Sequence, residues 1–497
     1  MDYVIGIDLG TSAVKALLVD RTGRIAASAG KEYPLHLPKA GYSEQNPEDW
    51  VRQTIAAVRE LMDTSGISPG QVQGIAFSGQ MHGLVLLDGA GRVLRPAILW
   101  NDTRTTEECR RIEAVLGGRL LEIARNPALE GFTLPKLLWV MRHEPDRFAA
   151  ARVFLLPKDY LRYRLTGQIH TEYSDAAGTL LLDVAGRRWS EEICEALGIE
   201  PSLCPPLVES HAPVGELLPE MAAAAGLSPR TKVFAGGADN ACGAIGAGIL
   251  AEGDTMCSIG TSGVVLRCEG GSAADYGGKV HLFNHARPGS YYAMGVTLAA
   301  GYSLSWFKDT FAPNESFEQL TRMAEDAPPG SGGLLFTPYL AGERTPHADA
   351  LIRGSFIGID GSHEKKHFVR AVLEGITFSL QESVDIFRRS GRRVDSVVSI
   401  GGGAKSRLWL QMQADIFDAE VVALANEQGP GMGAAMLAAF GSGWFDSLDA
   451  CAAAFVSKAE RYRPDPDAAA RYRELFAVYR EVYTQTRGIC AGLMAFR

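Results

Sequence analysis

Two Gly-Thr-Ser triplets begin at Gly10 and Gly260 of this 497-residue chain, within IDLGTS and SIGTSG. An apolar run short enough for a buried strand precedes each triplet, and a second apolar run follows it. A glycine and two hydroxyl side chains in a tight turn let backbone N–H groups approach a phosphate closely. The repeat therefore predicts that the two loops bind the phosphates of a nucleotide held between two similar domains.

Asp8 stands two residues before the first triplet, at the carboxyl end of an expected strand, where α/β proteins place ligand-contacting side chains. A carboxylate beside a phosphate loop repels phosphate unless a cation lies between them, so Asp8 predicts Mg²⁺ reached through water. The alternative is an aspartate that only forms the turn. Lys15 could reach the same phosphates or stay solvated at a strand edge.

Asp239 follows the strand pattern at 232–235 in the segment Gly-Gly-Ala-Asp-Asn and precedes a helical pattern at 241–249. We interpret its strand as the counterpart of the Asp8 strand, on the other side of an interdomain cleft. Asp239 is then the candidate general base, which accepts a hydroxyl proton during phosphoryl transfer. The alternative is that it only caps the helix N-terminus.

The segment SGQMHG at 78–83 places polar side chains between glycines and between two strand patterns. This arrangement favours polyol binding, with Met81 and His82 as shape and hydrogen-bond contacts. A lone histidine is otherwise more often a structural hydrogen bonder. Trp100, Asp102 and Arg104 form a similar polar cluster and are candidates for a supporting role.

Three other motifs match familiar sites only superficially. Gly401–Ser406 lacks the glycines at 399 and 404 that a P-loop needs. Gly429–Ala434 matches a dinucleotide fingerprint but has no following strand and acidic residue. Both should open helices whose bare backbone could pack against adenine, ribose or phosphate. His281 and His285 have the spacing of a helical metal pair in a segment that looks like strand or loop.

Composition limits the possible partners. The formal net charge of −9, with no basic run, gives no general attraction for nucleic acid or an anionic membrane. We see no signal peptide and no apolar stretch of about 20 residues. The eight cysteines form no CxxC pair, which favours a reducing cytoplasm over a disulfide framework or a zinc site.

Alternating strand and helix patterns predict an α/β protein, and the length favours at least two domains. We place the domains at 1–230 and 231–497, with the boundary in a Pro- and Gly-bearing stretch. Three N-terminal strand patterns, the third around 24–28, suggest an antiparallel meander on a sheet that then becomes parallel. Further patterns predict helices at 48–62, 135–142 and 363–389 and a last strand at 394–400. An aromatic stripe at 472–483 should pack on its own domain or a second subunit.

Together these segments resemble the FGGY carbohydrate kinases of the actin, Hsp70 and sugar kinase superfamily, along nearly the whole chain. The resemblance is carried by IDLGTS, YSEQNPEDW, SGQMHG, LRPAILWNDTR, LLPKDYLRYRLTG, SDAAGT, GGADN, SIGTSG, PYLAGERTPH, GGGAKS and GPGMGAA. The family has two ribonuclease H-like domains that flank an interdomain active-site cleft. Ala238 departs from the glycine of many members, which a methyl group should tolerate unless φ is positive.

The resemblance implies ATP-dependent phosphorylation of D-xylulose at its 5-hydroxyl group, with Mg²⁺, and a homodimer is an expectation at family level. It implies Asp239 as proton acceptor, Asp8 as the metal-associated carboxylate, and Met81, His82 and Asn240 as sugar contacts. It assigns the phosphates to Gly10, Thr11, Ser12, Gly260 and Thr261. It assigns a nucleoside site to Gly301, Ser305, Gly402, Gly403 and Arg407. The alternatives are L-ribulose, glycerol, gluconate or a deoxy-ketose as substrate, or a non-catalytic sugar-responsive or actin-like member.

Overall fold

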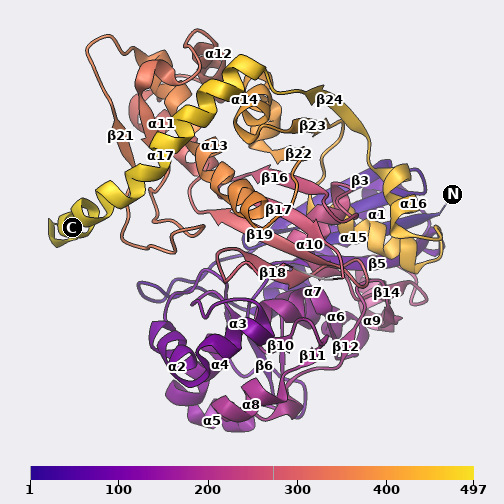
Figure 1. Cartoon of the computed structure of the whole chain (residues 1–497). Coiled ribbons are helices and arrows are strands. Elements are labelled where there is room, and N and C mark those ends of the chain that lie inside the picture. Colours follow the sequence, from indigo (N-terminus) through magenta and orange to yellow (C-terminus); the bar gives the residue numbers. More distant parts are fainter. Residues whose placement is uncertain (1, 272–273, 497) are drawn as a thin grey trace. The chain divides into compact units, whose positions relative to one another are not determined.

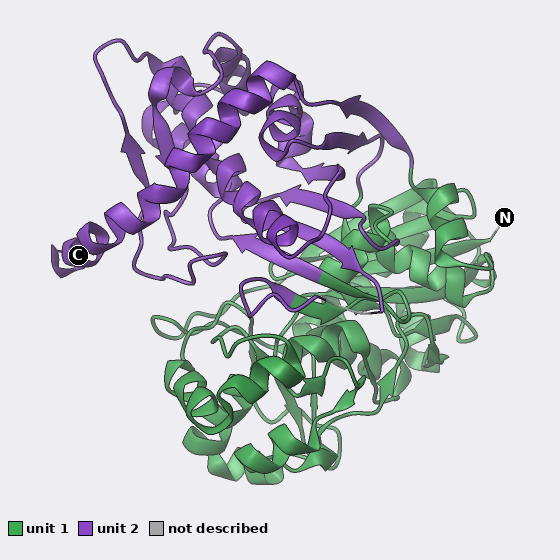
Figure 2. Cartoon of the chain, viewed as in Figure 1, with its two compact units in different colours: residues 1–250, 282–292, 428–456 green, residues 251–281, 293–427, 457–497 purple. Residues whose placement is uncertain are grey.

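The computed structural model describes residues 2–271 and 274–496 (Figure 1). The chain divides into two compact units, coloured separately in Figure 2. Unit 1 comprises residues 1–250, 282–292 and 428–456, and unit 2 comprises residues 251–281, 293–427 and 457–497. Each unit contains an α/β sheet, which confirms the predicted fold class.

The sheet of unit 1 begins as an antiparallel meander and becomes parallel, as predicted. Strands β1, β2 and β3 pair antiparallel in sequence, and β5 pairs parallel with β1. The strand order is β13-β14-β5-β1-β2-β3, and β15 also pairs with β5. The bounds are β1 Tyr3–Leu9, β2 Ala13–Asp20, β3 Ile25–Glu32, β5 Val72–Gly79, β13 Pro213–Glu216, β14 Lys232–Phe234 and β15 Gly237–Ala238.

The predicted division at residue 230 does not match these units. Strand β14, which we expected to open the second domain, pairs parallel with β5 in the first sheet. Strand β15 continues along β5, so Asp239 belongs to unit 1. Unit 1 runs on to residue 250 before the chain first enters unit 2.

Helices cover the unit 1 sheet. Asn46 caps the helix α1 (Pro47–Ser65), which ends at Gly66 in the left-handed conformation and buries Trp50 in the core. Helix α15 (Pro430–Gly441) packs on β1 so closely that a Cβ at Gly6 would lie 2.0 Å from the Gly431 carbonyl oxygen. Gly433 of GPGMGAA also serves close packing, because a Cβ there would lie 1.8 Å from the Cys242 carbonyl oxygen. The other helices of this unit are α2 Thr106–Leu116, α3 Gly118–Ala124, α4 Thr133–His143, α5 Pro145–Ala150, α6 Pro157–Thr166, α7 Tyr173–Ala176, α8 Glu191–Leu197, α9 Pro219–Ala225, α10 Asp239–Gly246 and α16 Leu448–Phe455.

Short strand pairs complete unit 1 outside the main sheet. They are β4 (Glu44–Gln45) with β7 (Ala97–Ile98), β6 (Val85–Leu87) with β8 (Val153–Leu155), β9 (Thr171–Glu172) with β12 (Leu207–Val208), and β10 (Leu182–Asp183) with β11 (Arg188–Trp189). Residues 282–292 contain most of β18 (His281–Asn284) and the start of β19 (Tyr291–Thr297). His281 therefore lies on a strand, where helical metal-pair spacing does not apply.

The sheet strands of unit 2 include β17-β16-β22-β23-β24 in that spatial order. Their bounds are β16 Thr255–Ile259, β17 Gly263–Glu269, β22 Ser396–Gly401, β23 Glu420–Leu424 and β24 Lys458–Tyr462. Strand β16 pairs antiparallel with β17 and parallel with β22. The strand pattern at 394–400 was predicted to be the last, yet β23 and β24 follow it.

Unit 2 contains the two longest helices of the described residues, α13 (Lys365–Arg389) and α17 (Pro466–Leu493). The aromatic stripe of α17 packs within the unit, because the rings of Tyr472, Phe476 and Tyr479 all contact Phe378 of α13. The other helices of unit 2 are α11 Gly301–Phe311, α12 Phe317–Glu325 and α14 Arg407–Phe417, and a short strand pair is formed by β20 Leu335–Thr337 and β21 Ser355–Ile357. None of the described helices combines the length and the apolar composition needed to cross a bilayer.

Candidate active site

Two carboxylates lie at the same end of the unit 1 sheet. Asp8 is the penultimate residue of β1 and stands opposite Ser78 of β5. Gly237 of β15 stands opposite Ser78 on the other side of β5, and Asp239 follows two residues later. The predicted separation of these two aspartates by a cleft is therefore wrong, because one sheet carries both.

The environment of Asp239 favours proton transfer near neutral pH. Asp239 is the first residue of α10, and the backbone N–H and side-chain Nδ2 of Asn240 both donate to its Oδ1, at 2.7 and 2.9 Å. Burial, and then the charge of Asp8, raise the pKa of Asp239 from 3.8 to about 7. Burial also raises the pKa of Asp8, although Ser78 and Lys15 oppose that effect. Perturbed carboxylates of this kind are typical of general bases.

The first Gly-Thr-Ser loop joins β1 to β2 and is held by glutamines. Gln45 Nε2 donates to the Thr11 carbonyl at 2.7 Å, and Thr11 Oγ1 donates to Gln80 Oε1 at 3.2 Å. The indole Nε1 of Trp100 donates to Thr11 Oγ1 at 2.9 Å. Gln80, which lies in the segment SGQMHG that was predicted to bind a polyol, thus positions the first Gly-Thr-Ser loop. The roles of Gln45 and Gln80 could not be recognised from local sequence.

Met81 and Asn240, both predicted as sugar contacts, meet in unit 1. Asn240 Nδ2 lies 3.7 Å from Met81 Sδ, and the hydroxyl of Tyr292 lies 3.9 Å from the same sulfur. Tyr292 is fully buried, and burial raises the pKa of its hydroxyl well above the ordinary value. Sequence reasoning missed Tyr292, because it comes from a strand more than 200 positions after Met81.

His82 is clamped in a conformation that a non-glycine residue rarely adopts. Its φ is +67°, in the left-handed region. Lys136 Nζ and Thr133 Oγ1 donate to the His82 carbonyl oxygen at 2.9 and 3.1 Å. The ring Nδ1 lies 2.6 Å from the Gly178 carbonyl oxygen, so Nδ1 carries a hydrogen and Nε2 is the acceptor of the neutral ring. Lys136 itself is fully buried, which lowers its pKa to about 7.

A fully buried charge cluster supports the segment that leads to Asp239. Lys158 lies 2.8 Å from Asp159, 3.0 Å from Asp175 and 3.3 Å from Glu172. Glu172 accepts a hydrogen bond from Ser174 Oγ at 2.8 Å, and the Ser174 oxygen accepts from the backbone N–H of Ala238 at 3.0 Å. The motifs LLPKDYLRYRLTG and SDAAGT therefore serve to position the backbone next to Asp239.

Trp100, Asp102 and Arg104 divide between two tasks. Trp100 contacts the first Gly-Thr-Ser loop through Thr11. Arg104 forms ion pairs with Asp102 at 2.6 Å and with Glu44 at 2.7 Å, all with largely buried side chains. Asp102 also accepts from the backbone N–H of Ser43 at 2.6 Å. This ion-pair group links the segment after Trp100 to Ser43 and Glu44, and its supporting role at a substrate site stays a prediction.

Unit 2 contains a separate pocket of about 610 Å³ beside its own Gly-Thr-Ser loop. The predicted nucleotide residues that line it are Gly260, Thr261, Gly301, Ser305 and Gly402. Sequence reasoning missed Phe317 and Trp409, which also line the pocket. An apolar pocket with a glycine-rich edge has the chemistry expected of a nucleoside site.

Gly301 fixes the second loop against α11. Its backbone N–H donates to the Gly260 carbonyl oxygen at 2.8 Å, and the next N–H, of Tyr302, donates to Thr261 at 3.1 Å. A Cβ at position 301 would lie 2.4 Å from the Gly260 oxygen, so only glycine fits. Gly403 does not line the pocket but packs on Ile259. Arg407 is also outside the lining, since it pairs with Glu460 at 2.6 Å with most of its side chain exposed.

The carboxylate pair suits a cation that is shared with a phosphate ligand. Mg²⁺ is commonly held by one or two carboxylates, substrate phosphates and water rather than by an all-protein cage. Within residues 2–271 and 274–496, no group of three or more His, Cys, Asp or Glu side chains could hold a metal by itself. Lys15 lies across from Asp8 in register and donates to Gln428 at 3.3 Å.

Comparison with known families and proteins shows which family has this pair of α/β units. Residues 3–246 match the N-terminal domain of the FGGY family of carbohydrate kinases, and residues 255–442 match the C-terminal domain. The chain belongs to the FGGY family of carbohydrate kinases. The first matched segment ends at residue 246 and the second begins at residue 255, so the boundary between them coincides with the end of the first stretch of unit 1 at residue 250.

Relatives of this kinase cover it from end to end. It is 62% identical over 497 residues to the xylulose kinase of Bacillus subtilis strain 168, covering 100% of both chains. The crystal structure of a "xyloylose kinase" from Brucella ovis is 35% identical, with a TM-score of 0.90, covering 98% of this chain and 100% of that one. The crystal structure of a gluconate kinase from Lactobacillus acidophilus is 28% identical, with a TM-score of 0.93 and 98% of each chain covered.

Proposed function

We propose that this kinase transfers the γ-phosphoryl group of ATP to the 5-hydroxyl group of D-xylulose. The observation that carries the proposal is a carboxylate with a pKa of about 7, Asp239, next to Asn240 and its contact Met81. The 62% identity to a xylulose kinase over the whole chain supports this choice of sugar.

In the proposed reaction, Asp239 accepts the proton of the attacking hydroxyl. Because Asn240 holds Oδ1 through two hydrogen bonds, Oδ2 is the oxygen assigned to the substrate proton. His82 Nε2 accepts from another sugar hydroxyl, while Met81 and Tyr292 shape the apolar side of the sugar site. Excluding water around these groups keeps the pKa of Asp239 high enough for proton transfer.

The nucleoside of ATP is assigned to the pocket of unit 2, and the two Gly-Thr-Ser loops, one in each unit, are assigned to its phosphates. Asp8 is assigned to Mg²⁺ and Lys15 to phosphate. The metal would supply charge neutralisation of the phosphates. Asp8 would orient it, whereas without the metal the charge of Asp8 raises the pKa of Asp239.

The decisive experiment measures ADP release with Mg-ATP and a panel of D-xylulose, L-ribulose, glycerol and gluconate. We expect kcat/KM to be highest for D-xylulose. Because a gluconate kinase shares this fold, gluconate is the most informative competitor. A higher kcat/KM for any other member of the panel overturns the choice of sugar, and ADP release with none of them overturns the assignment to this group of substrates.

We further propose a cytoplasmic enzyme that forms a homodimer. The eight cysteines are all free thiols, as expected in a reducing compartment. Large apolar side chains of α17 are exposed near its C-terminal end, at Ile489 and Leu493, and could pack on a second copy. Light scattering of the purified chain tests this proposal: a monomer at micromolar concentration contradicts it.

A further inference from the structure

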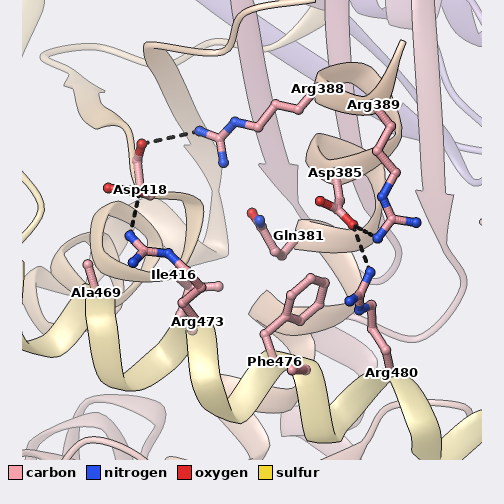
Figure 3. A pocket seen from close by; sticks show the side chains of 11 residues that line it. Gln381, Asp385, Arg388, Arg389, Ile416, Asp418, Ala469, Arg473, Phe476 and Arg480 are labelled. Atoms are coloured by element: carbon pink, nitrogen blue, oxygen red, sulfur yellow. Dashed lines mark hydrogen bonds and ion pairs between the residues drawn. The ribbon is translucent and has the colours of Figure 1, made fainter. Parts of the chain in front are cut away.

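A second pocket in unit 2 shares no lining residue with the nucleoside pocket. It has a volume of about 320 Å³ and lies between α13, the end of α14 and α17 (Figure 3). Arginines dominate its walls: Arg388 and Arg389 come from α13, and Arg473 and Arg480 come from α17. The proposed reaction does not use these guanidinium groups.

The positive charge of this pocket exceeds its negative charge. Asp385 pairs with both Arg389 at 2.7 Å and Arg480 at 3.3 Å, and Asp418 pairs with Arg473 at 3.0 Å. Four guanidinium groups thus face two carboxylates, which leaves two positive charges without a matching acid in the lining. Arg388 donates to backbone carbonyl oxygens, those of Val394 at 3.0 Å and Asp418 at 3.2 Å. An anion would complete this arrangement.

Gln381 provides an independent indication of a ligand. Its side chain lines the pocket although the residue is only 7% exposed, and its Oε1 has no hydrogen-bond partner among the described residues. In Figure 3 the amide lies between the Asp418 group and the Asp385 group. A buried amide oxygen without a partner is costly, and rotation about the last side-chain bond would turn either end of the amide toward a ligand. The ring of Phe476 supplies an apolar wall.

We propose that this pocket binds a small organic phosphate that carries hydroxyl groups. Guanidinium groups bind phosphate through paired N–H donors, and arginine is the preferred residue for this recognition. The dianion would lie between Arg388 and Arg473, and a ligand hydroxyl would hydrogen-bond the amide of Gln381. The same phosphate chemistry is present in free inorganic phosphate and in a sugar phosphate, so the experiment uses both.

Calorimetric titration with saturating ADP present tests this site, because ADP occupies the nucleoside pocket. The probes are inorganic phosphate and a ketopentose 5-phosphate. The double variant Arg473→Gln/Arg480→Gln removes two partly exposed guanidinium groups whose surface ion pairs contribute little stability, so it should fold. Arg92→Gln is the charge control, since Arg92 is 80% exposed and lies in unit 1.

We expect each probe to bind the Arg92→Gln variant with the same affinity as the unmodified kinase. The double variant should bind each probe at least about tenfold more weakly. Gln381→Met keeps the side-chain length without the amide. It should weaken the binding of the ketopentose phosphate about fivefold and leave the binding of inorganic phosphate unchanged.

Two results would overturn the proposal. One is the absence of saturable binding up to about 50 mM of either probe, which would identify the arginines as ion-pair contacts between α13 and α17 only. The other is binding that the double variant retains in full. Equal effects of Gln381→Met on both probes would remove Gln381 from ligand recognition. A ketopentose 5-phosphate would also be the product of the proposed reaction, but its binding in the active site is common to all of these variants. Only the difference between variants, and the binding of inorganic phosphate, are therefore assigned to this pocket.

Discussion

Asp8 and Asp239 lie at one end of a single sheet, on either side of β5, and the charge of Asp8 raises the pKa of Asp239. The two carboxylates therefore form an electrostatic pair within unit 1. A base with a pKa of about 7 is partly protonated at neutral pH, and it releases that proton when a nearby negative charge is neutralised, as a bound cation would do.

Asp239→Asn should lower kcat by at least about 100-fold, because an amide cannot accept the hydroxyl proton. Sugar affinity should stay within about threefold, since the variant keeps a hydrogen-bonding side chain of the same shape. Steady-state kinetics and calorimetric sugar binding check this result. Asp63→Asn, at an exposed surface ion pair, is the matched control. Near-normal turnover of Asp239→Asn would exclude Asp239 as the base.

The value of kcat/KM should fall as the pH is lowered through about 7, because Asp239 then takes up its proton. In Asp8→Asn the acid limb should move to lower pH, because the loss of the Asp8 charge lowers the pKa of Asp239. Overall activity should also fall. Profiles of both proteins at fixed ionic strength measure the shift. An unmoved acid limb contradicts the coupling between the two carboxylates.

The ionised Asp239 carboxylate should also lower the free energy of unfolding at alkaline pH. Its pKa is raised from 3.8 to about 7 in the folded chain, so the folded form binds a proton more tightly than the unfolded form. Stability is therefore lost as pH rises between these two values. Asp239→Asn should unfold at a higher Tm than the parent at pH 8, with a smaller difference at pH 5. A Tm difference that is independent of pH would argue against the raised pKa.

Lys136→Met should raise the KM for sugar about tenfold and leave the KM for ATP unchanged. The variant loses the Nζ donor that holds the His82 carbonyl, so the left-handed conformation at His82 is no longer fixed. Thr133→Val removes the second donor to the same carbonyl oxygen and should act in the same direction, with a smaller effect. An unchanged KM for sugar in both variants would show that this clamp does not act on the sugar site.

Gly301→Ala should raise the KM for ATP at least about tenfold, because the added methyl group meets the Gly260 carbonyl and displaces the second Gly-Thr-Ser loop. Gly488→Ala on α17 is the control, since a Cβ there meets nothing within 4 Å and helix propensity favours alanine. ATP binding by calorimetry separates this effect from sugar affinity, which should not change. Equal ATP affinities of the two variants would contradict the role of Gly301.

The sequence was informative where function depends on local pattern. The strand, glycine turn and strand at both triplets are present, and so are α13 and the packed stripe of α17. It was uninformative about pairing between distant segments. The run at 232–234 looks like any buried strand, and only its pairing with β5 shows that it belongs to the first sheet. The contacts from Gln45, Lys136 and Tyr292 were missed for the same reason, because each reaches the site from a distant segment.

The placement of α15 has a consequence for how the protein is made. Both carboxylates belong to a sheet whose strand β1 is covered by a helix that starts at residue 430. During synthesis from the N-terminus, that sheet stays uncovered on this face until most of unit 2 has left the ribosome. A fragment that ends at residue 250 would expose the apolar surface around Gly6 to solvent. The strand that carries Asp8 is thus among the first segments to be synthesised, and the helix that covers it is among the last.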